Sequence, residues 1–484
     1  MSLAVDRSGG EYLYRQVIDL IQDGIDAGTL RPGDRLPSLR RMSDRIGVSV
    51  PTVRQAYLEL ERQRRVESRP QSGFYVRAAR QNELVRPSPA FRQNSKPSSV
   101  CCRPLMERVY DGLYQVDAVP LGIANPCLAL PATKALHRTM KRVMSRVQDR
   151  ALTYAPTLGE PALRRQIAYR YLDTLGNSVD PDDICITNGG QEALLIALQA
   201  VAQPGDVVAV ESPTYHGVLE LIDSLGMLAI EIETCPAEGV MLDALERTLD
   251  THPVKACMLS TTLSNPLGAT MPESKRQQLV ELIEARDVVL IDDDVYGDLS
   301  FDGVRPRPAE YFSRRGNVLS CGSFSKTAAP GYRIGWLLPG RFGPEVERLK
   351  RAYSCSSGLL QQLTLAEFIA SGDYDRYLKA LRPALQQNAE RMRALVADYF
   401  PQETRTSDPV GGSVLWLELP DAVDAEDLFD RAIENGISIV PGQIFSPRAR
   451  YRHFIRLSFG HPWSTDIESA LSWLGREVAA MARD

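Results

Sequence analysis

The sequence has few of the features that mark membrane, secreted or metal-binding proteins. It contains no run of about 18 apolar residues, so we expect no membrane-spanning helix. Its first residues lack the apolar core of a secretory signal. The eight cysteines lack the spacing of a metal site or disulfide framework, and the five histidines form no HxxxH or similar set. We therefore expect a cytoplasmic protein with reduced thiols and no bound metal.

Lysine is absent from the first 80 residues. This stretch holds 14 arginines and 10 acidic residues and so carries +4, whereas the whole chain of 484 residues carries −5. A basic head on an acidic body is typical of a nucleic-acid-binding module joined to a second domain, although solvated helix faces give the same excess. The length exceeds one ordinary core and predicts two or more folding units.

The first 80 residues predict three helices followed by a hairpin. Residues 12–28 carry apolar side chains four apart, as an amphipathic helix does. Ser38 can cap a second helix, which Gly47 ends, and Ser49 can cap a third. Two short strands are expected within residues 66–76. This order is typical of a winged helix-turn-helix, a small α+β DNA-binding fold.

The rest of the chain predicts a linker and a larger α/β domain. Residues 86–99 are rich in Pro, Ser and charge, as linkers are. Strands then alternate with helices, which predicts a mostly parallel sheet covered on both faces. We expect a winged-helix domain at 1–78, a linker at 79–115 and a domain at 116–484, with a large part at 116–375 and a small α+β part at 376–484.

Several motifs at fixed spacing in the head resemble the GntR family of transcriptional regulators. They lie at residues 14–17, 30–40, 47–49, 52–57 and 72–76. The resemblance implies that the third helix enters the major groove of double-stranded promoter DNA. Val50 and Pro51 stand where family members often carry Arg or Lys, so the operator sequence does not transfer from relatives.

Five residues of the head are candidate DNA contacts. Arg40 and Arg54 are placed for base or phosphate contacts. Ser49 begins the third helix, whose N-terminal N–H groups attract phosphate, and Thr52 lies one turn further on. Gly73 lets the wing turn lie close to the DNA backbone.

Residues 320–336 resemble the lysine loop of fold-type I aminotransferases. The resemblance implies that Lys326 forms a Schiff base with pyridoxal 5'-phosphate (PLP). Ser323 and Arg333 are then implied phosphate ligands, together with the helix start at Gly190 and Gln191.

Further segments follow in the order that this family requires. Tyr215 matches the aromatic residue that stacks on the pyridine ring, and Asn265 and Tyr296 match the partners of the ring 3'-oxygen. Arg456 stands where aminotransferases bind the α-carboxylate of an amino acid. Tyr154 matches the tyrosine that reaches the phosphate of the partner subunit, which implies a dimer.

Asp293 is the implied partner of the pyridine nitrogen, because it lies three residues before Tyr296. Its carboxylate would hold the ring proton. Asp292 and Asp294 flank it, and strand alternation predicts that both point away from the side that Asp293 faces.

The fused architecture resembles the MocR subfamily of GntR regulators. The resemblance implies a homodimer, commonly head-to-tail and domain-swapped, that binds DNA with its heads. We expect the aminotransferase-like domain to sense an amino compound, or PLP itself. An active aminotransferase with an accessory DNA-binding head is the alternative, because every residue needed for half-transamination is present.

Overall fold

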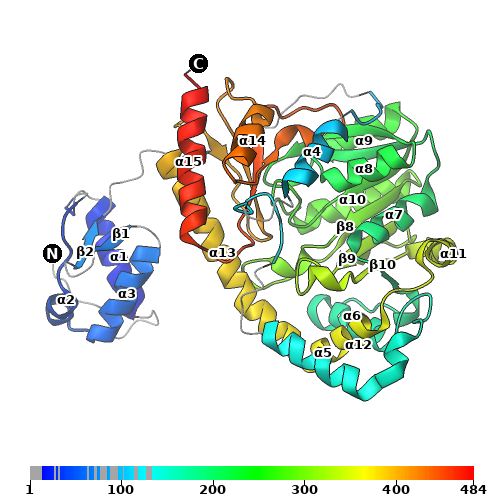
Figure 1. The fold of residues 1–484 in the computed structure, drawn as a ribbon, viewed down its shortest axis with the longest axis horizontal. Helices are drawn as coiled ribbons and strands as arrows, with labels where there is room; N and C mark the ends of the chain where they lie inside the picture. The colour runs from blue at the N-terminus through cyan, green and yellow to red at the C-terminus, as the bar shows by residue number, and fades with distance from the viewer. Residues whose placement is uncertain are drawn as a thin grey trace. The chain divides into compact units, whose positions relative to one another are not determined.

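A computed structural model describes residues 13–26, 29–30, 33–62, 65–69, 73–76, 84–87, 96–101, 103–113, 118–126 and 133–483 (Figure 1). These residues form two compact units that separate near residue 83. The expected turn at Arg31 and Pro32, the motif residue Ser72 and much of the expected linker lie outside the described residues.

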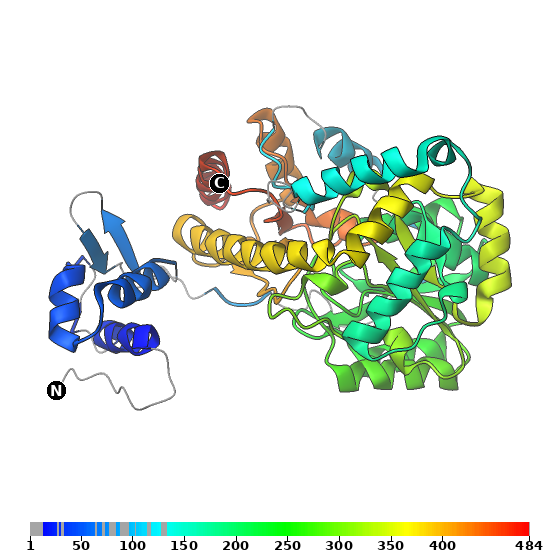
Figure 2. The ribbon, with the colours of Figure 1, turned by 90° about the horizontal axis from the view of Figure 1, so that it is seen from below.

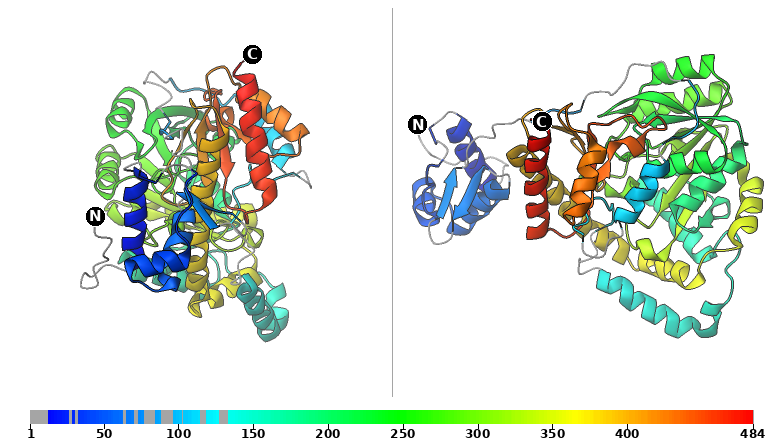
Figure 3. Two further views of the ribbon diagram at one scale, coloured as in Figure 1. Left: turned by 90° about the vertical axis from the view of Figure 1, so that its left-hand side faces the viewer. Right: turned by 45° about the horizontal axis from the view of Figure 1, so that its top comes forward.

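The N-terminal unit, called the head (residues 13–76), has the predicted order of elements. Its two strands pair as an antiparallel hairpin (Figure 3). A third segment also exchanges backbone hydrogen bonds with the second strand, through Gly33, Asp34 and Leu36. The sequence did not reveal this pairing. The elements are α1 (Leu13–Asp26), α2 (Leu39–Ile46), α3 (Val50–Arg62), β1 (Val66–Arg69) and β2 (Gly73–Val76).

Local chemistry fixes the helix ends in the head. The Ser38 hydroxyl accepts a hydrogen bond from the N–H of Arg41 at 3.3 Å, as a helix N-cap does. Gly47 ends α2 in the left-handed conformation. The Ser49 hydroxyl accepts from the N–H of Thr52 at 3.3 Å at the start of α3. The predicted caps are therefore confirmed.

The head has a core of its own, formed by one face of each helix. Val17 and Ile21 of α1 pack against Val53 and Tyr57 of α3, and all four are buried. The Tyr57 hydroxyl donates to the carbonyl of Pro37 at 2.9 Å, which satisfies its buried polar atom. These contacts hold α3 against α1 and leave its outer face exposed.

The C-terminal unit is built on an eight-stranded sheet in the order β3-β10-β9-β8-β7-β4-β5-β6. Strands β9, β8, β7, β4 and β5 run parallel, while β10 and β6 are antiparallel to their neighbours. The mostly parallel sheet is therefore confirmed. The strands are β3 (Cys185–Thr187), β4 (Val207–Ser212), β5 (Leu228–Cys235), β6 (Gly239–Val240), β7 (Val254–Leu259), β8 (Val289–Asp293), β9 (Val318–Ser323) and β10 (Gly335–Leu338).

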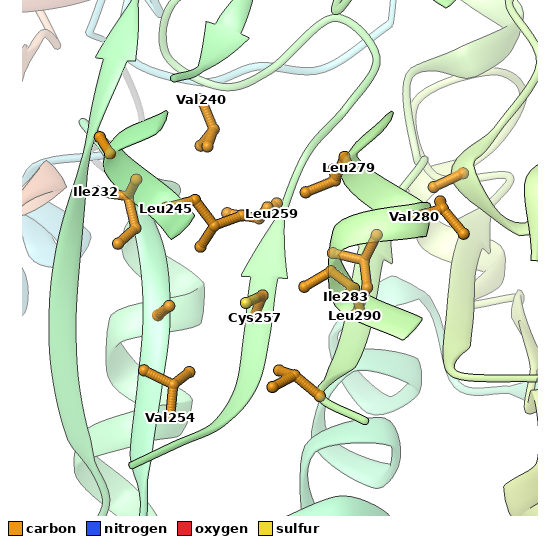
Figure 4. Close-up of a cluster of buried hydrophobic side chains, with 14 of the residues drawn as sticks. Ile232, Val240, Leu245, Val254, Cys257, Leu259, Leu279, Val280, Ile283 and Leu290 are labelled. Atoms are coloured by element: carbon orange, nitrogen blue, oxygen red, sulfur yellow. The ribbon is translucent and has the colours of Figure 1, made fainter. Parts of the chain in front are cut away.

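Helices cover both faces of this sheet. Figure 4 shows the core on one face, where Leu245 of α9 and Leu279 and Ile283 of α10 meet Cys257 and Leu290 of the strands. α7 packs on the opposite face, against β8, β9 and β10. The helices of this part are α4 (Arg103–Leu113), α5 (Thr133–Val147), α6 (Pro161–Leu175), α7 (Gly190–Val201), α8 (His216–Ser224), α9 (Leu242–Thr251), α10 (Glu273–Ala285), α11 (Gly343–Ser354) and α12 (Leu359–Ala370).

The small C-terminal part follows a long helix, α13 (Asp373–Tyr399), which Figure 2 shows running as one continuous element. Its sheet has the order β11-β12-β14-β13. The elements are β11 (Arg405–Thr406), β12 (Val414–Glu418), α14 (Ala425–Glu434), β13 (Val440–Pro441), β14 (Phe454–Ser458) and α15 (Thr465–Met481).

The predicted linker at 79–115 is wrong at its C-terminal end. Residues 103–113 form α4, whose Leu105, Met106 and Val109 are buried. Earlier in the segment, Ser98 exchanges two backbone hydrogen bonds of 2.9 Å with Ala229 of β5. The prolines and serines concealed this, because α4 buries its apolar face only against distant segments. Within the described part of the chain, none of the helices combines the length and the apolar character that a membrane-spanning segment needs.

Candidate cofactor and DNA-binding sites

A cavity of about 230 Å³ lies where β4, β7, β8 and β9 end. Sites form at this edge of α/β sheets because the loops that follow parallel strands converge there. Tyr154, expected to serve the partner's site, does not line the cavity and is 87% exposed. Ten sequence-predicted residues line it: Gly190, Gln191, Tyr215, Asn265, Asp293, Tyr296, Ser323, Lys326, Arg333 and Arg456.

Lys326 reaches the cavity from the loop after β9. Its Nζ donates to the carbonyl oxygen of Ala124 at 2.8 Å. Burial disfavours the ammonium form and, together with the positive charge of Arg456, lowers the pKa of the amine to about 8. More of the amine is therefore neutral and nucleophilic near neutral pH than for an exposed lysine.

Two of the three consecutive aspartates have structural partners. The Asp292 carboxylate accepts from the N–H and the hydroxyl of Thr261, both at 3.1 Å, and from the N–H of Ala309 at 3.0 Å. Asp294 forms a buried ion pair with Arg305. Both carboxylates serve to join the loops beside β8.

Asp293 lies at the end of β8 and faces the cavity instead. Its carboxylate accepts a hydrogen bond from the N–H of Val295 at 3.3 Å. Burial and the neighbouring Asp292 raise its pKa to about 7, although that hydrogen bond and the charge of Lys326 lower it. A cation brought to this carboxylate would therefore favour its ionised form.

The start of α7 and Arg333 form a concave surface beside Lys326. Arg333 Nη2 donates to the carbonyl of Asn188 at 3.2 Å. Gly189 has a φ of +81°, and a Cβ at this position would lie 2.5 Å from Arg333 Nη2. A Cβ on Gly190 would lie 3.0 Å from Val295. The glycines keep open a space beside the N–H groups of a helix start, which attract anions.

Two hydroxyls complete this surface. Ser323 Oγ donates to Ser325 Oγ at 3.0 Å and accepts from the N–H of Ser325 at 3.1 Å. Arg333 Nη1 lies 3.4 Å from Ser325 Oγ. Sequence reasoning assigned a role to Ser323 but not to Ser325, although Ser325 stands in the same motif next to Lys326.

The other polar side chains surround the space between Lys326 and Asp293. Tyr215, Asn265 and Tyr296 come from the loops after β4, β7 and β8. Burial raises the pKa of both tyrosine hydroxyls, so both stay protonated and can donate hydrogen bonds. The Asn265 side-chain oxygen accepts from Arg456 Nη1 at 3.5 Å.

Arg456 reaches the cavity from β14 of the small sheet and is 3% exposed. Its Nη2 donates to the carbonyl of Gly122, and its Nε has no hydrogen-bond partner within the described part of the chain. Burial lowers the pKa of its guanidinium. A buried guanidinium bonded only to neutral oxygens favours a carboxylate ligand.

Sequence reasoning missed two aromatic residues of the cavity wall. Tyr110 of α4 donates its hydroxyl to Glu220 at 2.8 Å, and its ring lies 5.8 Å from that of His216. Burial lowers the pKa of His216 to about 3, so this imidazole is neutral. Adjacency to Tyr215 could have identified His216, whereas Tyr110 lay in the segment interpreted as a linker.

Comparison with known proteins matches both units. Residues 117–472 match the model of aminotransferase class I and II, and residues 13–76 match that of the bacterial regulatory proteins of the gntR family. YjiR and YdcR of Escherichia coli, both named uncharacterized HTH-type transcriptional regulators, are each 35% identical over 465 residues, 96% of this chain and 98% of theirs. The chain belongs to the MocR subfamily of GntR regulators.

Solved structures agree with this assignment for the C-terminal unit of the MocR chain. LysN, an α-aminoadipate aminotransferase of Thermus thermophilus, superimposes with a TM-score of 0.71 at 26% identity. The match covers 78% of this chain and 95% of LysN, whose structure contains N-(5'-phosphopyridoxyl)-L-leucine. An aminotransferase class I and II domain implies PLP dependence.

The residues of this MocR chain fit PLP. The Gly189–Gly190 surface and Arg333 suit a phosphate, since side chains with a Cβ would fill the space. Lys326 offers a buried amine with a lowered pKa, as bonding to an aldehyde requires. Asp293 offers a buried carboxyl group that a protonated ring nitrogen would stabilise in its ionised form.

The head of the MocR chain presents the predicted DNA-contacting residues on its surface. Arg40, Arg54 and Ser49 are exposed and Thr52 is half-buried. The hydroxyls of Ser49 and Thr52 lie 2.7 Å apart at the start of α3. Gly73 has a φ of +111°, which favours glycine at the start of β2. A GntR helix-turn-helix domain implies that the chain binds DNA.

Proposed function

We propose that this protein is a cytoplasmic transcriptional regulator that binds promoter DNA with its head and senses a small molecule with a PLP-binding aminotransferase domain. The observation that supports this most is the joining of a GntR head to a cavity that keeps Lys326, Asp293, Arg333 and Arg456 together. The regulators YjiR and YdcR support it because they match along nearly their whole length.

The phosphate of PLP would be held by five residues of this chain and by one of the partner subunit. Lys326 would bond covalently to the cofactor, with Asp293 at the ring nitrogen, Tyr215 against the ring face, and Asn265 and Tyr296 at the 3'-oxygen. The phosphate ligands would be Gly190, Gln191, Ser323, Ser325 and Arg333 with the α7 N-terminus, and Tyr154 of the partner subunit.

When bound, PLP supplies an aldehyde carbon and a ring that withdraws electrons from it. The chain contributes the rest. Asp293 would hold a proton on the ring nitrogen, Lys326 would supply the amine that bonds to the aldehyde, and Arg456 would bind the carboxylate of an incoming amino compound. Because Arg456 comes from β14 and Lys326 from the large part, a bound amino acid would tie the two parts together.

Dimerisation follows from the proposed role of Tyr154. An exposed tyrosine seven residues before the start of α6 contributes little to its own cavity, and its 87% exposure leaves it able to reach a second copy. Mixing Lys326→Ala chains with Tyr154→Phe chains tests this. Mixed dimers contain one site with neither change, so they are expected to bind PLP more tightly than either parent protein. Mixed dimers that bind PLP no more tightly than the better-binding parent would show that each site uses one chain only.

PLP binding is tested with the purified full chain. We expect PLP to produce a visible absorbance band that survives gel filtration, and Lys326→Ala to lack it. A Lys379→Ala variant, which changes a lysine on α13 that does not line the cavity, serves as the matched control and should keep the band. A colourless wild-type protein would contradict the proposal.

Regulation is tested by selecting DNA from a genomic library and titrating it with and without PLP. An affinity that changes on adding PLP alone identifies the cofactor as effector, whereas a change only on adding an amino compound identifies the amine. Unchanged affinity in every case across a broad amine panel would contradict the proposed sensing.

A further inference from the structure

A fully buried lysine lies behind the proposed phosphate site and outside the cavity. Lys350 of α11 has no exposed side-chain surface, and its Nζ lies 2.8 Å from a carboxylate oxygen of Glu192. It also donates to Ser354 Oγ at 2.8 Å and to Ser357 Oγ at 3.0 Å. All three donors of the ammonium group are therefore engaged.

Glu192 connects Lys350 to the proposed phosphate site. It stands in the first turn of α7, and its carboxylate accepts from the N–H of Asn188 at 2.5 Å and from the Asn188 side-chain amide at 3.2 Å. The carbonyl of the same Asn188 accepts from Arg333. Asn188 therefore links Glu192 to Arg333.

Ser357, which accepts a hydrogen bond from Lys350, is itself held by other buried groups. The carbonyl of Ser357 accepts from the side chain of Gln362 at 2.8 Å, and the Gln362 side-chain oxygen accepts from the N–H of Glu160 at 2.7 Å. Gln362 is fully buried on α12. The lysine therefore sits on a fixed support rather than on a mobile surface.

A buried ion pair gives little net stability, because the desolvation of both charges offsets their attraction. Apolar residues of similar size would pack α11 on α7 at least as well. The pair does something that apolar residues cannot: it holds a carboxylate in the orientation that fixes the Asn188–Gly190 loop. It also neutralises an anion in the first turn of the helix whose N-terminus would receive phosphate.

We propose that Lys350 is a positioning residue for the phosphate of PLP, acting through Glu192 and Asn188 on the cradle formed by Gly189, Gly190 and Arg333. This inference rests on the proposed PLP binding. Without the lysine, the partly buried Glu192 carboxylate is left uncompensated, loses its orientation and repels the phosphate group. The effect is specific to phosphate, since Lys350 touches neither the ring side of the cavity nor Lys326.

The test compares PLP with pyridoxal, which lacks the phosphate, by equilibrium dialysis of the full chain. For Lys350→Met, we expect the Kd of PLP to rise on the order of ten-fold or more, as the loss of a charge-assisted hydrogen bond predicts, and that of pyridoxal to change less than two-fold. Arg348→Met on the same helix breaks the exposed pair with Glu345 and is expected to leave both constants unchanged.

Two results would overturn the inference: an unchanged Kd for PLP, or equal losses for PLP and pyridoxal, which indicate a general packing defect. If Lys350→Met does not fold, Ser357→Ala removes one bond to the ammonium with little change of volume and is expected to give a smaller loss of the same selectivity. Wild-type protein that binds no PLP would refute the proposed function itself, so the two failures are distinguishable.

Discussion

The rate at which PLP attaches to Lys326 should depend on pH with a midpoint far below that of an ordinary lysine. Only the neutral amine attacks an aldehyde, so the rate follows the neutral fraction. Burial and the charges of Arg456 and Arg333 lower the pKa of this amine to about 8, while Asp293 acts in the opposite direction. We expect the rate to rise steeply from pH 6 and to level off above the pKa.

The size of the effect follows from the two pKa values. At pH 7 an amine of pKa 8 is about 9% neutral, whereas one of pKa 10.5 is about 0.03% neutral, a difference of roughly 300-fold. Stopped-flow absorbance after mixing the PLP-free protein with PLP measures the rate at each pH. A ten-fold rise is expected between pH 6 and pH 7, and a rise of less than two-fold between pH 9 and pH 10.

A second variant identifies the cause. Arg456→Gln removes a positive charge near the amine, so the pKa of Lys326 should rise and the midpoint of the rate profile should move to higher pH. Arg448→Gln, which removes a charge from an exposed residue outside the cavity, should leave the midpoint in place. A wild-type rate that still rises about eight-fold from pH 9 to pH 10 would refute the reasoning, because that is the rise expected of an amine with the ordinary pKa of 10.5.

Three further outcomes can be measured. Asp293→Asn should stabilise the PLP-free protein by a few kcal/mol above pH 7 and have little effect near pH 4. The reason is that the raised pKa of Asp293 makes the stability of the wild-type protein fall as pH rises from about 3.8 to about 7. Thermal unfolding at both pH values checks this, and equal melting shifts would contradict it. Ser49→Ala should weaken the start of α3 by about 1 kcal/mol and lower the affinity for DNA, measured by fluorescence anisotropy, with an unchanged affinity as the adverse result. Arg54→Gln should weaken DNA binding, and a fall of about 0.9 in the slope of log K against log salt would identify a phosphate contact rather than a base contact.

Elements set by local chemistry were predictable from the sequence. The N-caps at Ser38 and Ser49 depend on one hydroxyl and an N–H three residues later, so spacing in the chain is enough to find them. The orientation of Asp292 and Asp294 away from the cavity followed from strand alternation, because a period of two turns neighbours to opposite sides, whereas their partners did not. Motifs with fixed spacing also predicted which side chains meet in the cavity.

Features made by distant segments were not predictable. The partner of Lys326 is the backbone carbonyl of Ala124. Every residue has a backbone carbonyl, so the sequence does not show which one accepts this hydrogen bond. Lys350 meets Glu192 across 158 residues, and neither lies in a pattern that distinguishes it from a solvated charge. Tyr110 was hidden because α4 becomes a helix only when its apolar face is buried against other segments.

The charged side chains of the cavity favour the binding of the proposed ligands. Lys326, Arg333 and Arg456 line it, and among the described lining residues the acidic side chains are Asp293 and Glu211, whose pKa values burial raises. The protein alone therefore holds an excess of positive charge in a buried place, which is unfavourable until anions enter. A phosphate and a carboxylate would supply those anions at two separate points, Arg333 and Arg456, while a protonated ring nitrogen would favour the ionised form of Asp293. Binding of the cofactor and of the proposed effector would thus relieve an imbalance that folding leaves in place, so an amino acid bound on Arg456 would have energy available to draw the small part toward the large one.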